Sequence, residues 1–423
     1  MNIKKTFTVG IFIFTLFDYS NAITLDELVE ILKEKNPTLN RQKIEKSISK
    51  TEKSKANRER LGKLELFSTF YRYEDKRVLY PITPPVNPTN LVGARNQLNV
   101  GIRYTVPIFT GFKLERKVEI KKLNKKLTDI RYYLTKNELI FNLKILYLKT
   151  LSLYKTKEAL LTYKNSLETL YKNIDEMVKV GKKPEVDLLK VKYELESVNA
   201  KIEKSNNSID SLKSSIKTLI GDESLDLSNM EDIKFSKVSY EKFDIEELYR
   251  LKAEYIKEKI GDLKIDIAKG DYFPEIYLNA SIQRNMGNSE YKDIWQVGLN
   301  LNYTLFDFGV RKRKYIKSVL EKKKIIEEKR KTVLEIKNRL REALNNIKTA
   351  EANIKAFKKQ LEYAKEVEDI EREKYMEGVS GLYDYLKAKA QRYLAESEYY
   401  NSLYDREIQI TYLKYLLEEF KNE

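Results

Sequence analysis

Two residue types are missing from this chain, which contains no cysteine and no histidine. Without a thiol or an imidazole there is no Cys or His nucleophile, no Ser-His-Asp triad, and no zinc or haem site with sulfur or imidazole ligands. Disulfides and a lipid-modified cysteine are excluded for the same reason. Carboxylate-only metal or glycosidase sites stay open, but 64 Asp and Glu residues make chance carboxylate pairs certain. We therefore expect no enzyme, no cofactor and no metal site.

Long apolar runs are also scarce. The longest, "TFTVGIFIFTLF", follows the basic segment "MNIKK" and precedes "SNA", which ends at Ala22. This pattern predicts a secretory signal peptide over residues 1–22. A membrane-spanning helix needs about 20 apolar residues, and no other stretch of the sequence approaches that length. We therefore expect a mature chain without a transmembrane helix.

The charge is unbalanced, with 80 Lys and Arg residues against 64 Asp and Glu and a net charge of +16. A basic chain raises the question of nucleic acid. Here the lysines are mixed with glutamates, as in "EKKKIIEEKR" at 321–330, which is typical of a solvated helix face. No nucleic-acid-binding motif is present, so we expect no nucleic-acid partner.

Glycine and proline are rare, and both are missing from residues 113–178 and 310–377. A helix of about 66 residues spans roughly 100 Å, whereas a globular helix averages about 11–12 residues. Apolar residues recur there, and in the following segments, at alternating spacings of three and four. One series is Val333, Ile336, Leu340, Ala343, Ile347, Ala350, Ile354, Phe357, Leu361 and Ala364. Another is Leu188, Val191, Leu195, Val198, Ile202, Ser205, Ile209, Leu212, Ile216 and Leu219. The spacing predicts coiled-coil packing, and a bundle without a lumen stays open as an alternative.

The same order of motifs occurs twice in the sequence, at an offset of 197 residues. Gly181 in "GKKPEVDLL" matches Gly378 in "GVSGLYDYL", and Phe109 in "PIFTGF" matches Phe306 in "TLFDFG". The offset is constant over about 80 residues, which indicates an internal duplication. Each repeat is expected to contain a leading helix, a β hairpin, a long helix, a tip turn and a return helix.

The expected boundaries follow from the motifs. In the first repeat, residues 23–220, the leading helix lies near 24–60, the hairpin near 64–109 and the tip turn at 181–187. In the second, residues 244–423, they lie near 244–270, near 275–306 and at 378–384. Residues 221–243 lack a long periodicity and are expected to link the repeats as an equatorial segment.

Four stretches alternate between apolar and polar residues, which predicts β-strands of about ten residues. Apolar residues occupy alternate positions at Leu98, Val100, Ile102, Tyr104 and Val106, at Ile276, Leu278, Ala280 and Ile282, and at Trp295, Val297, Leu299, Leu301, Tyr303 and Leu305. The strand at 64–74 is weaker, with Phe67, Thr69, Tyr71 and Tyr73 on one face. The loop at 75–96 holds four of the eight prolines and is expected to be irregular, and a shorter loop is expected near 286–293.

Strands of this length suit a tilted bilayer crossing. Aromatic residues near their ends suit an interfacial girdle, namely Tyr71, Tyr73, Tyr104, Trp295, Tyr303 and Phe306. Four strands in a mostly helical chain make a poor soluble sandwich. Four strands also cannot close a barrel, and open edges are not tolerated in lipid. The chain is therefore expected to pool strands with copies of itself, two copies giving eight strands and three giving twelve.

Signal peptide, repeats, strands and long helices together resemble the outer-membrane efflux protein family (TolC-like). The stretches that carry the resemblance are "ITLDELVEILKEKNPTL", "VPIFTGF", "VGKKPEVDLL", "LNYTLFDFG" and "EGVSGLYDYL". The resemblance implies a homotrimer with a 12-stranded transmembrane β-barrel in outer-membrane lipid and a coiled-coil helical tunnel through the periplasm. It also implies docking to a periplasmic adaptor (membrane fusion) protein and an inner-membrane pump. The function implied is a passive exit duct of a tripartite efflux pump or a type I secretion system.

The two tip turns supply the candidate site residues. By resemblance they are docking tips for the adaptor, and the candidate contacts are Gly181, Pro184, Val186, Gly378, Gly381 and Leu382. Turn chemistry alone also explains them, because Gly181 suits a helix end and Pro184 the first turn of the next helix. A further hypothesis places Asp187, Tyr375 and Asp384 at a constriction of the lumen. The alternative is that both aspartates are ordinary helix-start acids.

Two other functions use some of the same elements. A trimeric outer-membrane adhesin with a coiled-coil stalk also gives four strands per chain to a barrel, but its strands lie together at the C-terminus. A periplasmic adaptor has helical hairpins, but its β domains lack bilayer-length alternation. The order of elements here, two hairpins each followed by helices, favours the duct over both.

Overall fold

The computed structural model describes residues 22–87, 91–235 and 244–421. The predicted signal peptide, apart from Ala22, lies outside the described residues, as does the end of the predicted link between the repeats. The chain forms two compact units, each made of three segments. The first contains residues up to 35, 143–237 and 354–407, and the second contains 36–142, 238–353 and 408–423. Each unit draws on both sequence repeats, so units and repeats do not coincide.

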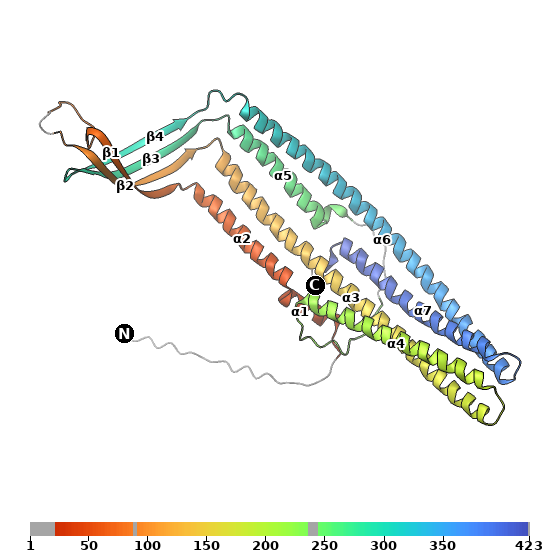
Figure 1. Cartoon of the computed structure of the whole chain (residues 1–423). Helices are drawn as coiled ribbons and strands as arrows, with labels where there is room; N and C mark the ends of the chain where they lie inside the picture. The colour runs from red at the N-terminus through yellow and green to blue at the C-terminus, as the bar shows by residue number, and fades with distance from the viewer. Residues whose placement is uncertain (1–21, 88–90, 236–243, 422–423) are drawn as a thin grey trace, which may run out of the picture. The chain divides into compact units, whose positions relative to one another are not determined.

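Two long helices have the same length. Helix α3 (Lys113–Lys179) and helix α6 (Val310–Met376) each contain 67 residues (Figure 1). Their first residues lie 197 positions apart, and so do their last residues. Each is followed by a shorter helix, α4 (Glu185–Ile220) after α3 and α7 (Leu382–Leu416) after α6. The ends of α3 and α6 lie within one residue of the expected ends, because glycine and proline mark where a helix stops.

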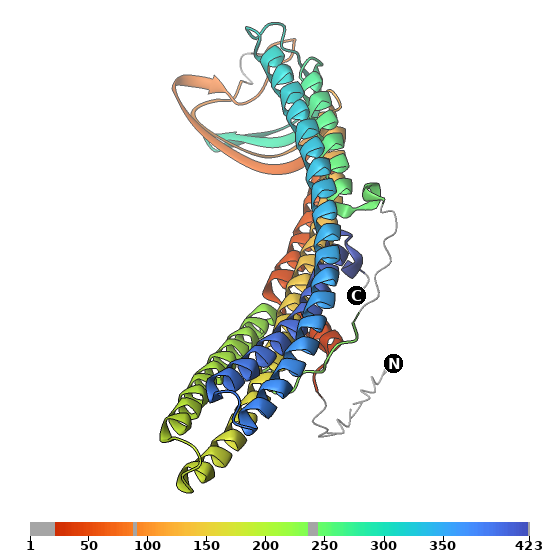
Figure 2. The same cartoon turned by 90° about the vertical axis from the view of Figure 1, so that its right-hand side faces the viewer.

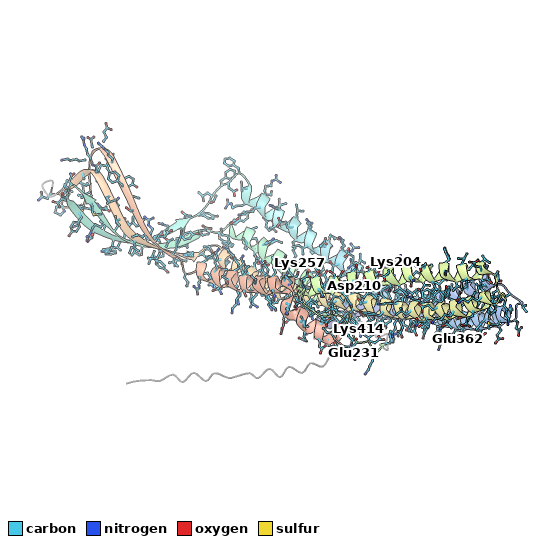
Figure 3. The ribbon with its side chains drawn as sticks, turned by 60° about the horizontal axis from the view of Figure 1, so that its bottom comes forward. Lys204, Asp210, Glu231, Lys257, Glu362 and Lys414 are labelled. Atoms are coloured by element: carbon cyan, nitrogen blue, oxygen red, sulfur yellow. The ribbon has the colours of Figure 1, made fainter. Side chains whose placement is uncertain are left out.

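The first unit is helical. It contains α1 (Leu25–Lys35), α4 and parts of α3, α6 and α7. Its core uses the predicted heptad positions, all of which are buried or half-buried on α4. Residues between these positions, such as Lys204 and Asp210, are exposed and project from the helix surface (Figure 3). Apolar residues on one stripe and charges on the other faces are what a packed surface helix requires.

The leading helix of the first repeat is divided. Expected as one helix near 24–60, it ends as α1 at Lys35, and α2 (Pro37–Glu59) starts anew. The Asn36 side chain accepts a hydrogen bond from the backbone N–H of Leu39 at 2.8 Å, and Pro37 occupies the first position of α2. Asparagine followed by proline is a helix-start signal, which explains the correction.

The leading helix of the second repeat also starts later than expected. A short 3₁₀ turn, η2 (Ile245–Glu247), precedes α5 (Tyr249–Gly270). The buried carboxylate of Glu418, beside the 3₁₀ turn η3 (Glu419–Lys421), accepts backbone hydrogen bonds from Tyr249 and Arg250. These bonds satisfy donors that a helix start leaves unpaired, so the cap for α5 comes from the far end of the chain.

The second unit contains one antiparallel sheet, whose order is β1 (Lys63–Val78), β2 (Gly93–Phe109), β3 (Glu275–Gly287) and β4 (Glu290–Asn302). The strands are curved and twisted (Figure 2). The second hairpin loop is shorter than the expected 286–293, because Asn288 and Ser289 alone connect the strands. Both have positive φ, 51° and 63°, which is the geometry of a two-residue type I′ turn.

The sheet has one apolar and one polar face. A cross-strand row on the first face consists of Leu66, Ile102, Ile282 and Trp295. The neighbouring row, on the second face, consists of Glu65, Arg103, Ser281 and Gln296. The even-numbered residues of β1 therefore share the apolar face, and Phe67, Thr69, Tyr71 and Tyr73 lie on the other one. The alternation of apolar and polar residues within β1 is too weak to predict which of its residues lie on the apolar face. The register of pairing with β2 decides that instead.

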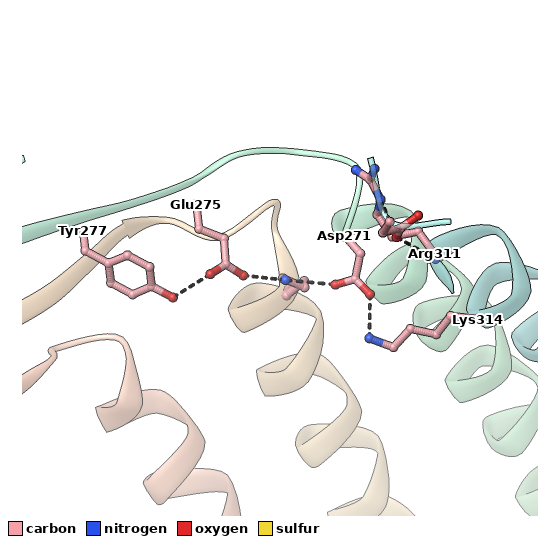
Figure 4. A network of polar contacts seen from close by, with 7 residues as sticks. Asp271, Glu275, Tyr277, Arg311 and Lys314 are labelled. Carbon is pink, nitrogen blue, oxygen red and sulfur yellow. Dashed lines mark hydrogen bonds and ion pairs between the residues drawn. The ribbon is translucent and has the colours of Figure 1, made fainter. Parts of the chain in front are cut away.

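Lys113 connects the sheet to the helices of the second unit. Its ammonium nitrogen lies 2.9 Å from a carboxylate oxygen of Asp271 and 2.6 Å from one of Glu275. Lys314 contacts the other oxygen of Asp271 at 2.6 Å, and the Tyr277 hydroxyl donates to Glu275 at 3.0 Å (Figure 4). One network thus joins the starts of α3, α6 and β3 to the end of α5. Among the described residues, no helix combines the length and the apolar character that a membrane span requires.

Candidate functional site at the helix turns

The turn after α3 is a Schellman motif, the helix-ending pattern of two backbone hydrogen bonds around a left-handed residue. Gly181 has a φ of 72° and donates its N–H to the carbonyl of Val178 at 2.9 Å. The N–H of Lys182 donates to the carbonyl of Met177 at 2.8 Å. Glycine is favoured because it adopts a positive φ without a side-chain clash.

The turn after α6 repeats this geometry. Gly378 has a φ of 76° and donates to the carbonyl of Tyr375 at 3.2 Å, and Val379 donates to Lys374 at 2.8 Å. Gly181 and Gly378, which the sequence matches at the 197-residue offset, therefore end their helices by the same pair of hydrogen bonds. Both chain reversals follow from local backbone chemistry.

The helices after the turns start close to the expected positions. Pro184 is the residue before α4, with an extended φ of −77° and ψ of 147°, and not the first helical residue. Asp187 lies in the first turn of α4. Gly381 directly precedes α7, and Asp384 lies in its first turn.

Below the turns, a cluster of buried side chains joins the four helices. It contains Leu170, Ile174, Val191, Tyr375, Leu382 and Tyr385. The rings of Tyr375 and Tyr385 are stacked with centroids 5.8 Å apart. Leu382, expected as an adaptor contact, is only 2% exposed, so its side chain packs this core and offers no surface. The reason is that the heptad-like stripe of α7 begins at its first residue.

Part of the exposed apolar surface near the turns lines a groove of about 490 Å³ between α4 and α7. Its lining residues are Val186, Leu189, Lys190, Tyr193, Glu194, Tyr383, Leu386, Lys387 and Ala390. Val186 is expected from the sequence to face a partner, and it is 51% exposed. The contribution of Leu189, Tyr193 and Tyr383 was not expected. The available signal was that Leu189 and Tyr193 are apolar residues four apart that fall outside the heptad series of α4.

The three residues of the constriction hypothesis differ in environment. Asp187 is 8% exposed, and its carboxylate accepts from the Lys190 ammonium at 3.1 Å. Asp384 is exposed and has no ion-pair partner within the described ranges. Tyr375 is buried. Of the two carboxylates, Asp384 is the one that the single chain leaves exposed.

Tyr375 connects the two turns. The Lys183 ammonium of the first turn lies 4.2 Å from the centre of the Tyr375 ring, within cation–π range. The Tyr375 hydroxyl is buried and has no hydrogen-bond partner among the described residues. Burial, reinforced by the Asp187 carboxylate, raises the pKa of Tyr375 to about 12. A buried hydroxyl without a hydrogen-bond partner lowers the stability of the fold, so replacing Tyr375 tests whether its hydroxyl is unpaired.

We expect Tyr375→Phe to raise the free energy of unfolding by about 1 kcal/mol at neutral pH, because it removes an unpaired buried hydroxyl. Because burial raises the pKa of Tyr375 in the folded state, the native protein loses stability as pH rises from 10 towards 12, where the unfolded chain ionises this tyrosine and the folded chain keeps it neutral. The variant should therefore lose less stability than the native protein in that window. Urea unfolding of the detergent-solubilised protein, followed by circular dichroism, measures both effects.

The control for this prediction is Tyr385→Phe, which removes a hydroxyl from the stacking partner and keeps both rings. Destabilisation by Tyr375→Phe alone would show that the hydroxyl has a hydrogen-bond partner in the assembled protein. That result would contradict the expectation and would favour the constriction hypothesis.

A buried charged cluster lies further along the same helices. Lys389 of α7 is 6% exposed, and its ammonium contacts a carboxylate oxygen of Glu368 on α6 at 3.0 Å. It also donates to the hydroxyl of Ser166 on α3. Arg392 approaches the second oxygen of Glu368 at 3.7 Å. The sequence offers no local sign of this cluster, because its members lie on three helices. In the part of the chain that the structure describes, no group of three or more acidic side chains lies together in a way that could hold a metal ion.

A two-faced sheet of four strands, with each β hairpin leading into a long helical hairpin, is the arrangement of elements that the sequence resemblance to TolC-like proteins implies. Residues 258–417 match the family model described as outer membrane efflux protein. This match lies in the second repeat and confirms the resemblance that the sequence motifs indicate. No curated protein matches the chain significantly.

Solved structures with the same fold cover almost the whole chain. A membrane protein from Pseudomonas aeruginosa is 16% identical, with 93% of each chain covered and a TM-score of 0.80. The CmeC outer membrane channel of Campylobacter jejuni is 18% identical over 93% of this chain and 85% of its own, with a TM-score of 0.78. The open state of the MtrE outer membrane channel of Neisseria gonorrhoeae is 16% identical over 93% and 88%, with a TM-score of 0.77. At these identities the likeness establishes the fold.

Proposed function

We propose that this protein is the outer-membrane exit duct of a tripartite efflux pump or a type I secretion system. Three copies pool their strands into a 12-stranded barrel in the outer membrane, and the helices enclose a tunnel that extends into the periplasm. The duct is passive and receives its cargo from a periplasmic adaptor and an inner-membrane pump. The turns after α3 and α6, with the groove beside Val186 and Tyr383, are the docking surface for the adaptor.

The two-faced sheet is the observation that carries this proposal. Its apolar face is exposed in the single chain, with Leu66 and Trp295 at 77% and 76% exposure. Strands β1 and β4 each pair on one side only within the described chain. An exposed apolar face with two open edges is unstable in water and in lipid alike, since both the apolar surface and the unpaired backbone must be covered. Joining copies edge to edge in a bilayer satisfies both requirements.

Substitutions on neighbouring residues of β4 test the barrel. Val297 shares the apolar face with Trp295, whereas Gln296 belongs to the polar row. An arginine facing lipid costs about 2 kcal/mol or more, while one facing the lumen is tolerated. We expect Val297→Arg to abolish the heat-modifiable trimer in outer-membrane fractions and Gln296→Arg to preserve it. Loss of the trimer in both variants, or in neither, would exclude the proposed orientation of the sheet.

Conductance tests the constriction. In a trimer, Asp384 would contribute three carboxylates at one level, and these would attract multivalent cations. We expect Asp384→Ala to weaken cation blockade of the reconstituted channel by roughly tenfold, because the charge at the narrow point is removed. Asp187→Asn, which alters a buried paired carboxylate, should change blockade less. Unchanged conductance and blockade in Asp384→Ala would mean that Asp384 only starts a helix.

A further inference from the structure

The junction between β4 and α6 exposes an unusual amount of apolar surface. Leu305, Phe306 and Phe308 are 83%, 72% and 91% exposed. The rings of Phe306 and Phe308 contact each other edge to face, with centroids 4.8 Å apart. Three large apolar side chains within four residues form a patch that water solvates poorly.

Phe308 is exposed although its backbone adopts a strained conformation. Phe308 and Gly309 have positive φ values of 52° and 85°. A bulky residue is strained in that conformation. The matching junction between β2 and α3 also uses two such residues, but Phe112 there contacts the rings of Phe109 and Phe273. Among the described residues, the ring of Phe308 contacts only that of Phe306, which is itself 72% exposed, so Phe308 keeps a strained backbone without being buried.

Cations follow the exposed aromatics directly. Residues 311–314 read "RKRK", and the first turn of α6 contains no acidic residue. Arg311 pairs with Asp307 at 2.9 Å and Lys314 pairs with Asp271 at 2.6 Å. Lys312 and Arg313 are exposed and have no ion-pair partner within the described ranges. Positive charge at the start of a helix opposes the helix dipole, so helix stability does not account for them.

The start of α3 provides an internal comparison. At the 197-residue offset, Glu115 stands where α6 has Lys312, and Arg116 stands where α6 has Arg313. Arg116 is paired with Glu119 at 3.3 Å. Of the two junctions, the second therefore combines exposed aromatics with unpaired cations, although each junction leads from a β hairpin into a 67-residue helix.

We propose that Leu305, Phe306, Phe308, Lys312 and Arg313 form a binding surface for anionic phospholipid. This inference rests on the proposed function, which places the junction at the periplasmic boundary of the barrel. Aromatic side chains favour the headgroup level of a bilayer, and basic residues beside them attract anionic headgroups. Lys312 and Arg313, which have no ion-pair partner within the described ranges, fit an anionic headgroup, and coverage of the patch by a second copy of the chain is a separate outcome of the test.

The test uses the full-length mature trimer extracted in a mild detergent. Labelled phosphatidylglycerol and phosphatidylcholine are added in turn, and retained lipid per trimer is counted by native mass spectrometry. We expect the native protein to retain phosphatidylglycerol preferentially. The double variant Lys312→Gln/Arg313→Gln should lower that preference by about tenfold or more, since each cation near the surface contributes to the attraction.

Lys323→Gln/Lys324→Gln is the matched control. It removes the same charge from exposed residues further along α6, beyond the aromatic patch, and it should leave the preference unchanged. Equal losses in both double variants would overturn the proposal in favour of a non-specific charge effect. Absence of any preference in the native protein would also overturn it. If the Lys312/Arg313 variant instead weakens the trimer without added lipid, another copy of the chain covers the patch and the proposal fails.

Phe308→Asn tests the apolar part independently. Asparagine tolerates a positive φ, so this change relieves strain and removes the ring. We expect folding and trimer assembly to be retained, and lipid retention to fall for both phospholipids. Unchanged retention would overturn the role of Phe308. Channel formation is measured on the same samples: a protein that forms no channel refutes the proposed function, whereas a working channel without lipid preference refutes only this inference.

Discussion

Glu368→Leu is expected to lower the free energy of unfolding by about 3 kcal/mol, because it leaves Lys389 charged and buried without its carboxylate partner. Lys389 is only 6% exposed, and its remaining partners are the Ser166 hydroxyl and the face of the Tyr385 ring. Neither neutralises the charge. The measurement is urea unfolding of the detergent-solubilised protein, followed by helical circular dichroism.

Removing Lys389 instead of Glu368 should lower the free energy of unfolding by less. In Lys389→Met, Glu368 keeps Arg392 within 3.7 Å, so we expect a loss of about 1 kcal/mol, comparable to a partly exposed ion pair. The double variant Glu368→Leu/Lys389→Met should be more stable than Glu368→Leu alone, since replacing both members of a buried pair by apolar residues is often nearly neutral. Equal losses in the two single variants, or additive losses in the double variant, would show that Lys389 is not held by Glu368.

Gly111→Ala is expected to destabilise the protein by about 3 kcal/mol. Gly111 has a φ of 61°, and a β-carbon added there would clash with the backbone carbonyl oxygen of Gly270. The left-handed backbone accounts for about 1 kcal/mol and the clash with rigid backbone for about 2 kcal/mol. The clash arises because the β2–α3 and α5–β3 junctions approach each other through their glycines.

Gly378→Ala is the control for this prediction. Gly378 also has a positive φ, 76°, but no atom lies within 4 Å of its added β-carbon. We expect a loss of about 1 kcal/mol, which is the cost of the left-handed conformation alone. The same unfolding measurement applies. A loss in Gly111→Ala no larger than in Gly378→Ala would mean that the junctions do not approach as described.

Features that depend on residues close together in the sequence could be predicted from it. The ends of α3 and α6 lie within one residue of expectation because glycine and proline mark helix ends. The heptad series on α4 is buried because its spacing places it on one stripe. The alternating residues of β2, β3 and β4 share faces as expected, because side chains alternate along any strand, although β4 ends at Asn302, before the predicted Tyr303 and Leu305.

The candidate site was predictable only in part. The glycine turns were found because their residues control backbone conformation directly. Of the residues that line the groove beside Val186, the sequence identified only Val186 as a candidate, since the lining comes from two helices that are distant in sequence. Leu382 was misplaced on the surface, because exposure at a helix start depends on which helices surround it. The face of β1 was likewise decided by its register with β2.

By itself, the sequence determined the lengths of the helices, the sites of the chain reversals and the alternation of the strands, because these depend on residues a few positions apart. Only the tertiary structure decided that Lys389 meets Ser166 across 223 residues of sequence, that Glu418 caps α5, and that Gly111 faces Gly270. Such contacts form when elements pack together. Polar and backbone groups from distant segments then satisfy one another's charges and hydrogen bonds, and no local spacing encodes that pairing.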